Sequence, residues 1–248
     1  MKKSLVILSG WGVDKFVWGP IVEMLKGEFE IFIIDWSDIL SLEGIKYKVL
    51  RLLRKKGIER FSLLGWSLGS LVGLDLARTH SSKIDNLILL SPTCKFVKDS
   101  STAYDIGWHK KILKRMITML KSCPEETLES FFRNLFTEEE VENEIYHNYL
   151  KKVKSLDSGY SVESLVLGLE YLMQRDLRED IKNINIPALI LHGDEDMICP
   201  VESGRYIREN LKESKLVILK KTGHIPFYTK TSHCYELIIN YISNKEGW

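Results

Sequence analysis

The segment from residue 63 to residue 70 constrains the fold of this chain more than any other. It contains Gly65-Trp66-Ser67-Leu68-Gly69, between an apolar run (Phe61–Leu64) and a helical one (Leu71–Ala77). A Gly-x-Ser-x-Gly pattern at such a junction predicts a turn so sharp that the serine is strained and its side chain stands clear. A Cβ atom at either outer glycine would collide with a neighbouring strand or helix. The pattern also arises in ordinary glycine-rich turns, but its place between a strand and a helix makes Ser67 a candidate nucleophile.

A serine in such a turn needs a carboxylate and then a histidine later in the chain. A buried strand is expected over Ile186–Leu191 and runs into a turn that contains Asp196. Another strand is expected over Lys215–Leu219, followed by a loop that contains His224. Because these loops follow strands of one sheet, we expect their side chains to lie above the same sheet edge as Ser67. His224 is then the base that takes the serine proton, and the carboxylate fixes its tautomer and stabilises the imidazolium.

The acidic turn offers three carboxylates, at positions 194 to 196. Asp196 is our choice because it stands three residues after Gly193 and four before Pro200. We expect the other two to cap the turn or to face water, as loop carboxylates usually do. Among the other histidines, His192 lies at a strand end and is expected to be packed or hydrogen-bonded structurally.

An oxyanion site in this arrangement uses two backbone N–H groups. The first is that of Leu68, directly after the candidate nucleophile. The strand expected over Leu5–Leu8 ends in Ser9-Gly10-Trp11-Gly12, where two glycines allow a close backbone approach, and the N–H of Trp11 is our second donor. The indole of Trp11 either forms a wall of the acyl pocket or only packs.

Together these motifs resemble the α/β-hydrolase superfamily and, within it, the family of pimeloyl-[acyl-carrier protein] methyl ester esterases of biotin synthesis. The matching segments are Gly10-Trp11-Gly12 with Trp18, Gly65-Trp66-Ser67-Leu68-Gly69, Leu76-Ala77-Arg78-Thr79-His80, Gly168-Leu169-Glu170-Tyr171-Leu172 with Asp176-Leu177-Arg178, Gly193-x-x-Asp196 with Pro200, and Gly223-His224-Ile225-Pro226-Phe227. The resemblance implies a catalytic triad of Ser67, Asp196 and His224, with oxyanion donors at Trp11 and Leu68. It also implies that Phe131 touches the substrate, as Trp11 is expected to do.

Three features depart from that family. Ser9 stands where a histidine is usual, so the hydrogen bonding there is lost or changed. Ser70 replaces a common third glycine of the elbow. The chain also begins almost directly at its first central strand, without the N-terminal hairpin of its relatives, so a sheet of about six strands is expected.

Strands and helices alternate as a mostly parallel, doubly wound α/β sheet requires. A helix is expected over Phe16–Leu25. Between about Asp99 and Asp180 the strand signal disappears and only amphipathic helices remain. We therefore expect a hydrolase core formed by residues 1–98 and 181–248, with a helical cap, residues 99–180, inserted between its strands.

Composition limits the other classes of function. With 248 residues and 44% hydrophobic content, the chain fits one α/β domain with a cap. A formal net charge of +1 gives no general attraction for nucleic acid or a membrane surface. The four cysteines show no metal-ligand spacing, which favours buried free thiols in a reducing cytoplasm. We expect a cytoplasmic monomer that needs no metal or organic cofactor.

The expected cap has an apolar face and a basic one. The apolar residues, some of which we expect to line an acyl tunnel, are Trp108, Ile112, Met116, Met119, Leu120, Leu128, Phe131, Phe132, Leu135 and Phe136. The basic residues Lys110, Lys111, Lys114 and Arg115 fall in one helix that contains no acid. They either dock an acidic acyl-carrier protein or form a solvated lysine-rich face. The next helix carries Glu125, Glu126 and Glu129, which opposes docking there.

The sequence thus predicts a serine carboxylesterase that cleaves a carboxylic methyl ester through an acyl-enzyme, with pimeloyl-[acyl-carrier protein] methyl ester as the substrate that the resemblance implies. A general short-chain carboxylesterase, a lactonase and a thioesterase remain alternatives of the same fold. A menaquinone-type lyase and a non-catalytic receptor of this fold are further alternatives. The apolar cap opposes the lyase, and the complete Ser-Asp-His set opposes the receptor.

Overall fold

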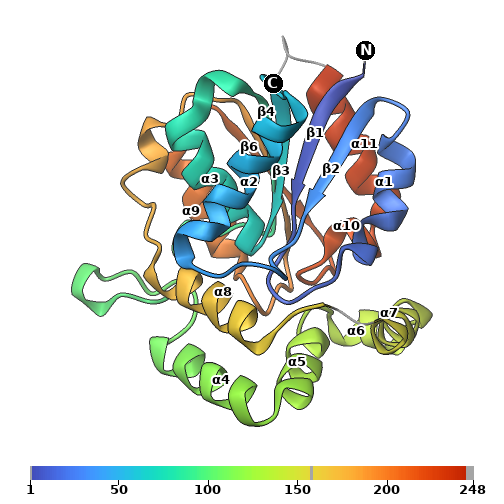
Figure 1. The fold of residues 1–248 in the computed structure, drawn as a ribbon, viewed down its shortest axis with the longest axis vertical. Coiled ribbons are helices and arrows are strands. Elements are labelled where there is room, and N and C mark those ends of the chain that lie inside the picture. The colour runs from blue at the N-terminus through green and yellow to red at the C-terminus, as the bar shows by residue number, and fades with distance from the viewer. Residues whose placement is uncertain (1, 157–158, 244–248) are drawn as a thin grey trace.

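A computed structural model describes residues 2–156 and 159–243, and its centre is one parallel sheet (Figure 1). Its six strands lie in the order β2-β1-β3-β4-β5-β6, and every neighbouring pair is parallel. The strands are β1 (Lys3–Leu8), β2 (Phe29–Ile34), β3 (Phe61–Trp66), β4 (Ile84–Leu90), β5 (Ala188–Gly193) and β6 (Ser214–Leu219). The expected parallel sheet of about six strands is confirmed.

Helices cover both faces of the sheet, as the crossover between parallel strands requires. They are α1 (Gly19–Leu25), α2 (Leu42–Lys56), α3 (Leu68–His80), α9 (Val201–Asn210), α10 (Pro226–Thr229) and α11 (Thr231–Ser243). Helices α1 and α11 pack together on one face, whereas α2, α3 and α9 lie on the other (Figure 1). The strands β3 and β5 are buried along their whole length between these layers. Short 3-10 turns complete the regular structure: η1 (Lys15–Trp18), η2 (Ser81–Lys83), η3 (Ser100–Thr102) and η4 (Ile181–Asn183).

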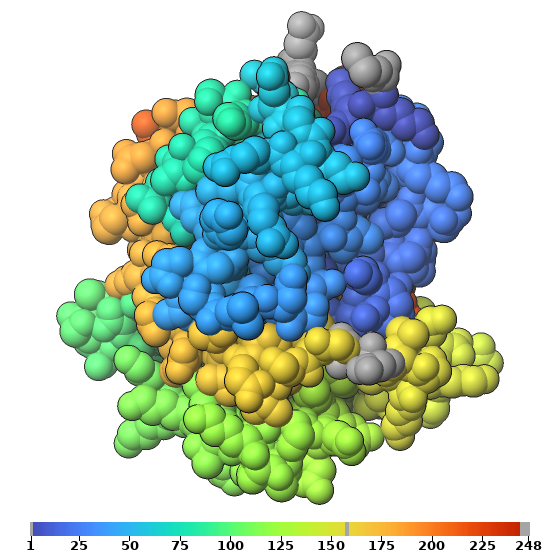
Figure 2. All heavy atoms as spheres, viewed as in Figure 1, coloured from blue at the N-terminus to red at the C-terminus, as the bar shows by residue number. Residues whose placement is uncertain are grey.

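The chain between β4 and β5 forms a separate helical layer. It contains α4 (Lys110–Ser122), α5 (Pro124–Arg133), α6 (Glu138–Glu142), α7 (Glu144–Ser155) and α8 (Val162–Gln174). This layer lies beyond the carboxyl ends of the strands, with α8 nearest the sheet (Figure 1). In the space-filling view it forms a band against that end of the core (Figure 2). Residues 157 and 158 of the expected cap, and residues 1 and 244–248 of the expected core, lie outside the described residues.

Proline accounts for two differences from the expected element bounds. The expected helix Phe16–Leu25 is divided into η1 and α1, because Pro20 cannot continue a helix from the preceding turn but fits the first turn of a new one. The strand expected from Ile186 begins at Ala188 instead. Pro187 has no N–H to donate, so the ladder of a central strand starts after it.

Among the helices in the described part of the chain, none combines the length and the apolar character needed to cross a membrane.

Candidate active site

Ser67 lies at the junction of β3 and α3, in a backbone conformation that side chains rarely adopt. Its φ is 54° and its ψ is −118°. A Cβ atom added to Gly65 would lie 2.5 Å from the carbonyl oxygen of Gly69, and one added to Gly69 would lie 2.1 Å from that of Leu8. Neither contact is sterically allowed, so both outer glycines are required. The surrounding packing therefore holds a strained serine, which is a feature typical of functional sites.

Asp196 and His224 meet at the same edge of the sheet. Asp196 lies in the loop after β5, His224 lies in the loop after β6, and His224 Nδ1 is 2.8 Å from Asp196 Oδ2. The other carboxylate oxygen accepts N–H bonds from Ile198 at 2.8 Å and Cys199 at 2.9 Å. Burial opposes ionisation of Asp196, but the two histidines beside it outweigh that effect and lower its pKa. The carboxylate is therefore ionised, and it orients the histidine ring through Nδ1.

The opposite nitrogen of the His224 ring is left available. His224 is fully buried, and its Nε2 has no hydrogen-bond partner among the described residues. With Nδ1–H donated to the carboxylate, Nε2 carries the lone pair that a base uses. Ser67 is 4% exposed, and its side chain lies beside the Cys199 thiol. Burial raises the pKa of that thiol, so Cys199 is a neutral neighbour of the serine.

The neighbouring carboxylates take the places expected of them. Asp194 pairs with Lys220 at 3.2 Å, and Glu195 is exposed. Of the three carboxylates in this turn, Asp196 is the one bonded to His224.

A second histidine supports the same carboxylate. His192, at the end of β5, has its Nε2 2.7 Å from the Cys199 carbonyl and 3.3 Å from Asp196 Oδ2. Because a carbonyl only accepts, Nε2 carries the proton. The ring is fully buried, and a Cβ added to Gly204 would lie 2.5 Å from its Nδ1. His192 thus has the structural, hydrogen-bonded place expected of it, and it also supports the acidic turn.

Two backbone amides are the candidate oxyanion donors. In the described part of the chain, the N–H groups of Trp11 and Leu68 donate to no other residue. The Trp11 ring is fixed from the helical layer: its Nε1 donates to the Leu165 carbonyl at 2.8 Å, and the ring meets Phe131 edge-on at 4.8 Å. A Cβ added to Gly168 would lie 2.5 Å from Trp11 Cδ1, which explains a glycine at that point of α8.

An apolar cavity lies beside Ser67. Its lining residues are Trp11, Ser67, Phe96, Trp108, Leu113, Met116, Phe131, Leu169, Leu172 and Ile198. The cavity has a volume of about 20 Å³, which is near the space that one water molecule needs. An outer groove of about 420 Å³ between α4 and α5 shares Trp108, Met116 and Phe131 with this cavity. These three side chains therefore stand between the surface and Ser67. The Trp11 indole both packs and forms a wall of the cavity.

Aromatic side chains support the histidine loop from the core. Trp66, inside the elbow, donates its Nε1–H to the His224 carbonyl at 2.8 Å. Phe227 stacks on Trp18 at 3.9 Å and meets Trp66 at 5.0 Å. Trp18 in turn donates Nε1–H to the Ser9 hydroxyl at 3.0 Å. The small Ser9 thus makes a hydrogen bond where the related family has a histidine, and Trp66 is a supporting residue that the sequence analysis did not identify.

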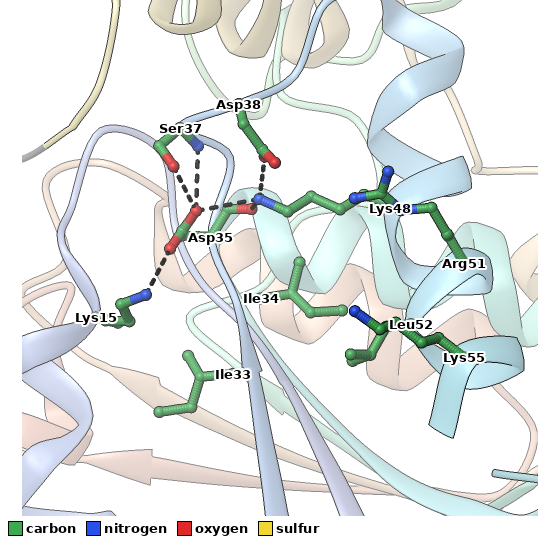
Figure 3. Close-up of a pocket in the computed structure, with 10 residues that line it drawn as sticks. All are labelled: Lys15, Ile33, Ile34, Asp35, Ser37, Asp38, Lys48, Arg51, Leu52 and Lys55. Carbon is green, nitrogen blue, oxygen red and sulfur yellow. Dashed lines mark hydrogen bonds and ion pairs between the residues drawn. The ribbon is translucent and has the colours of Figure 1, made fainter. Parts of the chain in front are cut away.

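A second hollow, of about 380 Å³, lies at the end of β2 (Figure 3). Its centre is Asp35, which accepts from Ser37 and pairs with Lys48 and Lys15. Burial opposes ionisation of this carboxylate, but the hydrogen bonds from Ser37 and the charge of Lys48 outweigh it and lower its pKa. The side chain of Arg51 also faces this hollow (Figure 3). The candidate catalytic residues take no part in its lining, so the network serves to fix the loop after β2.

The four basic residues expected on one cap helix lie on α4. Lys110, Lys111, Lys114 and Arg115 are all exposed. Within the described ranges, none of the four forms an ion pair. Arg115 also lines the outer groove between α4 and α5. Glu126 lines the same groove, so its charge is mixed.

Comparison with known proteins agrees with this geometry. A family model described as the alpha/beta hydrolase fold matches residues 41–231. Proteins named pimeloyl-[acyl-carrier protein] methyl ester esterase are similar over most of their length. The one from Legionella pneumophila (strain Paris) is 29% identical over 92% of this chain and 90% of its own. The one from Vibrio vulnificus (strain YJ016) is 27% identical over 95% and 92%.

Solved structures share the fold at lower sequence identity. An esterase from Exiguobacterium antarcticum superposes with a TM-score of 0.83 at 21% identity, covering 97% of this chain and 92% of its own. A bromoperoxidase from Bacillus anthracis reaches 0.86 at 19% identity, covering 98% and 92%. Sheet order, elbow and family match together show that the chain belongs to the α/β-hydrolase fold family.

Proposed function

We propose that this chain is a serine carboxylesterase that hydrolyses the methyl ester of a pimeloyl group carried on acyl-carrier protein. The observation that carries the esterase assignment is the 2.8 Å bond from His224 Nδ1 to Asp196, with Nε2 unpaired among the described residues. The substrate follows from the names of relatives similar over more than 90% of this chain. The lining beside Ser67 is apolar, as a methylene chain requires, but its cavity of about 20 Å³ must widen between Trp108, Met116 and Phe131 to admit an acyl group.

The reaction begins when Ser67 Oγ attacks the ester carbonyl and its proton passes to His224 Nε2. The N–H groups of Trp11 and Leu68 stabilise the tetrahedral oxyanion. Collapse breaks the bond to the methoxy group, which takes the proton from His224 and leaves as methanol. Water then attacks the acyl-enzyme carbonyl and gives a proton to His224, which forms a second tetrahedral intermediate. Collapse of this intermediate breaks its bond to Ser67, which takes the proton back from His224 as the carboxylic acid leaves. Asp196 stabilises the imidazolium in both halves.

The carrier protein is proposed to dock on α4. Acyl-carrier proteins are acidic, and four exposed cations without ion-pair partners in the described residues offer complementary charge. Arg115 joins this surface to the groove that leads toward Ser67. Charges at the rim of an interface mainly raise the association rate. We therefore expect simultaneous alanine substitution of Lys110, Lys111, Lys114 and Arg115 to raise KM for the carrier-bound ester only.

Methanol release from the carrier-bound methyl ester, from the free ester and from a short p-nitrophenyl ester tests this proposal. Faster turnover of the carrier-bound ester supports the full assignment. Cleavage of short esters alone supports the esterase and overturns the substrate, leaving a general small-ester hydrolase. No cleavage of any ester overturns both. The matched control for docking is Arg51→Ala with Lys55→Ala, which removes cations from the hollow at β2 and should leave KM unchanged.

A further inference from the structure

The loop that carries His224 is bonded to the helical cap as well as to the core. The His224 N–H donates to the Leu135 carbonyl at 2.8 Å, and the Gly223 N–H donates to Glu140 Oε2 at 3.1 Å. Leu135 lies between α5 and α6, and Glu140 lies in α6. Two consecutive amides of the histidine loop are therefore held by cap residues more than eighty positions earlier in the chain.

Glu140 does more than begin its own helix. Its Oε2 accepts the Thr137 N–H at 2.9 Å, and Thr137 Oγ1 accepts the Glu140 N–H at 3.0 Å, which is a capping box. The same Oε2 also accepts from Gly223. Glu140 is only 8% exposed, and within residues 2–156 and 159–243 no cation pairs with it and its Oε1 has no partner. Burying a carboxylate without a cation is costly, so its N–H bonds are its main compensation.

The backbone of the loop is shaped for this contact. A Cβ added to Gly223 would lie 2.6 Å from the Leu135 carbonyl oxygen and 2.9 Å from Glu140 Oε2. Lys221, two residues earlier, has a φ of 51°, in the left-handed region. Its Nζ reaches Glu139 Oε2 at 3.1 Å, which adds an exposed ion pair between cap and loop. Glycine is thus required where the cap approaches, and the turn before it is strained.

The core binds the other backbone polar group of His224, its carbonyl. The His224 carbonyl accepts the indole N–H of Trp66, next to Ser67, while its N–H is bonded to the cap. The His224 backbone is therefore fixed between the elbow and the cap, and its imidazole meets Asp196 from that fixed position. A loss of either anchor would let the ring move relative to Ser67.

We propose that Glu140 is a positioning residue: from the cap, it holds the Gly223–His224 backbone so that the imidazole keeps its place between Asp196 and Ser67. The inference rests on the proposed function, because it assigns His224 as the base. In this role the cap not only selects the substrate but also fixes the position of His224. Glu140 acts through the loop and touches no substrate.

The test compares Glu140→Ala, Glu140→Gln and Glu138→Ala for hydrolysis of a p-nitrophenyl ester. We expect Glu140→Ala to lower kcat by about 10–100-fold with little change in KM, because a shift of about 1 Å in a catalytic group costs about that much. Glu140→Gln keeps an oxygen that accepts both N–H bonds, so it should recover most of the activity. Glu138 is the matched control, because it begins the same helix, is 89% exposed and pairs with Arg133 rather than the loop.

Hydrogen exchange at the Gly223 and His224 amides gives a readout that is independent of activity. Exchange should be faster in Glu140→Ala than in Glu140→Gln or Glu138→Ala, at equal melting temperature. Wild-type exchange together with wild-type kcat in Glu140→Ala overturns the proposal, as does a rise in KM with kcat unchanged. If Glu140→Ala does not fold, Glu140→Met, which fills the same space without an oxygen acceptor, carries the test: rapid loop exchange with reduced kcat supports the role, and wild-type values of both overturn it. An absence of wild-type esterase activity would refute the proposed function, while exchange would still report on the contact.

Discussion

At the scale of single residues, the Asp196 carboxylate is the most completely specified group of the site. It accepts two backbone N–H bonds through Oδ1 and faces two histidines through Oδ2. Three hydrogen bonds, with His192 Nε2 a further neighbour at 3.3 Å, leave this buried carboxylate little freedom to rotate. Its pKa is lowered despite its burial because His224 and His192 outweigh desolvation, so it is ionised at neutral pH.

Replacement of Asp196 by asparagine tests that arrangement. The amide cannot hold His224 in the Nδ1–H tautomer or stabilise its cation, so we expect kcat to fall by about 10³–10⁴-fold while the fold persists. Steady-state kinetics on a p-nitrophenyl ester measure kcat, and a thermal melt of each protein shows whether the fold persists. Asp194→Asn is the control, since Asp194 lies in the same turn but pairs with Lys220. A kcat above one tenth of the wild-type value in Asp196→Asn would contradict the role.

Gly168 offers a second test at this scale, because it determines where Trp11 lies. A methyl group there would come within 2.5 Å of Trp11 Cδ1 and push the ring, together with its backbone N–H, away from Ser67. We expect Gly168→Ala to lower kcat by about 10-fold or more, since a displaced oxyanion donor contributes less to the transition state. Unchanged kcat with a raised KM would instead assign Gly168 to substrate binding alone.

At the scale of elements, the elbow depends on the close approach of α3 to β1 and β3. Gly69 in α3 lies against the Leu8 carbonyl, whereas Gly73, one turn later, would place a Cβ 3.6 Å from Leu63 Cδ2 in ordinary contact. The same glycine-to-alanine change should therefore have opposite effects at two positions of one helix.

We expect Gly69→Ala to prevent folding or to lower the melting temperature severely, because backbone atoms of β1 cannot move aside. Gly73→Ala should stabilise the protein by about 0.5–1 kcal/mol through helix propensity. Chemical denaturation of both variants measures the difference. Equal stability of the two would mean that the elbow does not require the contact between Gly69 and β1.

Local sequence patterns predicted most of these elements, but not all of their boundaries. The parallel sheet and the elbow followed from local patterns, because the strands are continuous apolar runs and the glycines are sterically required. Pro20 and Pro187 shifted two boundaries because each removes a backbone donor where regular structure was expected.

The support of the site was harder to predict, because it joins distant segments. Ser67, Asp196 and His224 were identifiable from their places after strands. The bonds from Trp66, His192 and Glu140 could not be, since each depends on tertiary contact between separate loops. The capping-box spacing of Thr137 and Glu140 indicates the start of a helix, but it does not predict that the carboxylate also accepts a bond from Gly223.

At the scale of the whole molecule, charged residues fasten the cap where its chain leaves and re-enters the core. Lys95 pairs with Asp176 at 2.7 Å and with Asp99 at 3.4 Å, and Arg178 pairs with the same two carboxylates. An antiparallel bridge joins Lys95 to Asp176 directly. Partial burial opposes ionisation of Asp176, but bonds from Arg178 and Lys95 lower its pKa overall. The hydroxyl of Ser101 is the main cause that lowers the pKa of Asp99 to about 2.

The lowered pKa values of Asp176 and Asp99 determine how the stability of the fold changes with pH. A carboxylate with a lowered folded-state pKa stabilises the fold above its unfolded value of about 4, and that stabilisation is lost as the pH falls toward the folded value. We expect Asp176→Asn to lower the melting temperature at pH 7 by about 1–3 °C, as partly exposed pairs contribute little. The difference from wild type should shrink progressively below about pH 4. Thermal melts at pH 7, 4 and 2.5 measure it.

The control for the cap connection is Asp105→Asn, whose carboxylate is 87% exposed and pairs with Lys98. It should melt within error of the wild type at pH 7. A difference for Asp176→Asn that stays constant from pH 7 to pH 2.5 would show that its carboxylate charge is not what fastens the cap.

The most direct test of Ser67 as the nucleophile is intact-protein mass spectrometry after reaction with a fluorophosphonate, which phosphonylates an activated serine. We expect a single adduct, mapped by peptide sequencing to Ser67. This adduct should be absent in Ser67→Ala and should form far more slowly in His224→Ala. No adduct on Ser67 in the folded wild-type protein, or equal labelling of Ser67→Ala, would contradict the assignment of this site as a serine esterase.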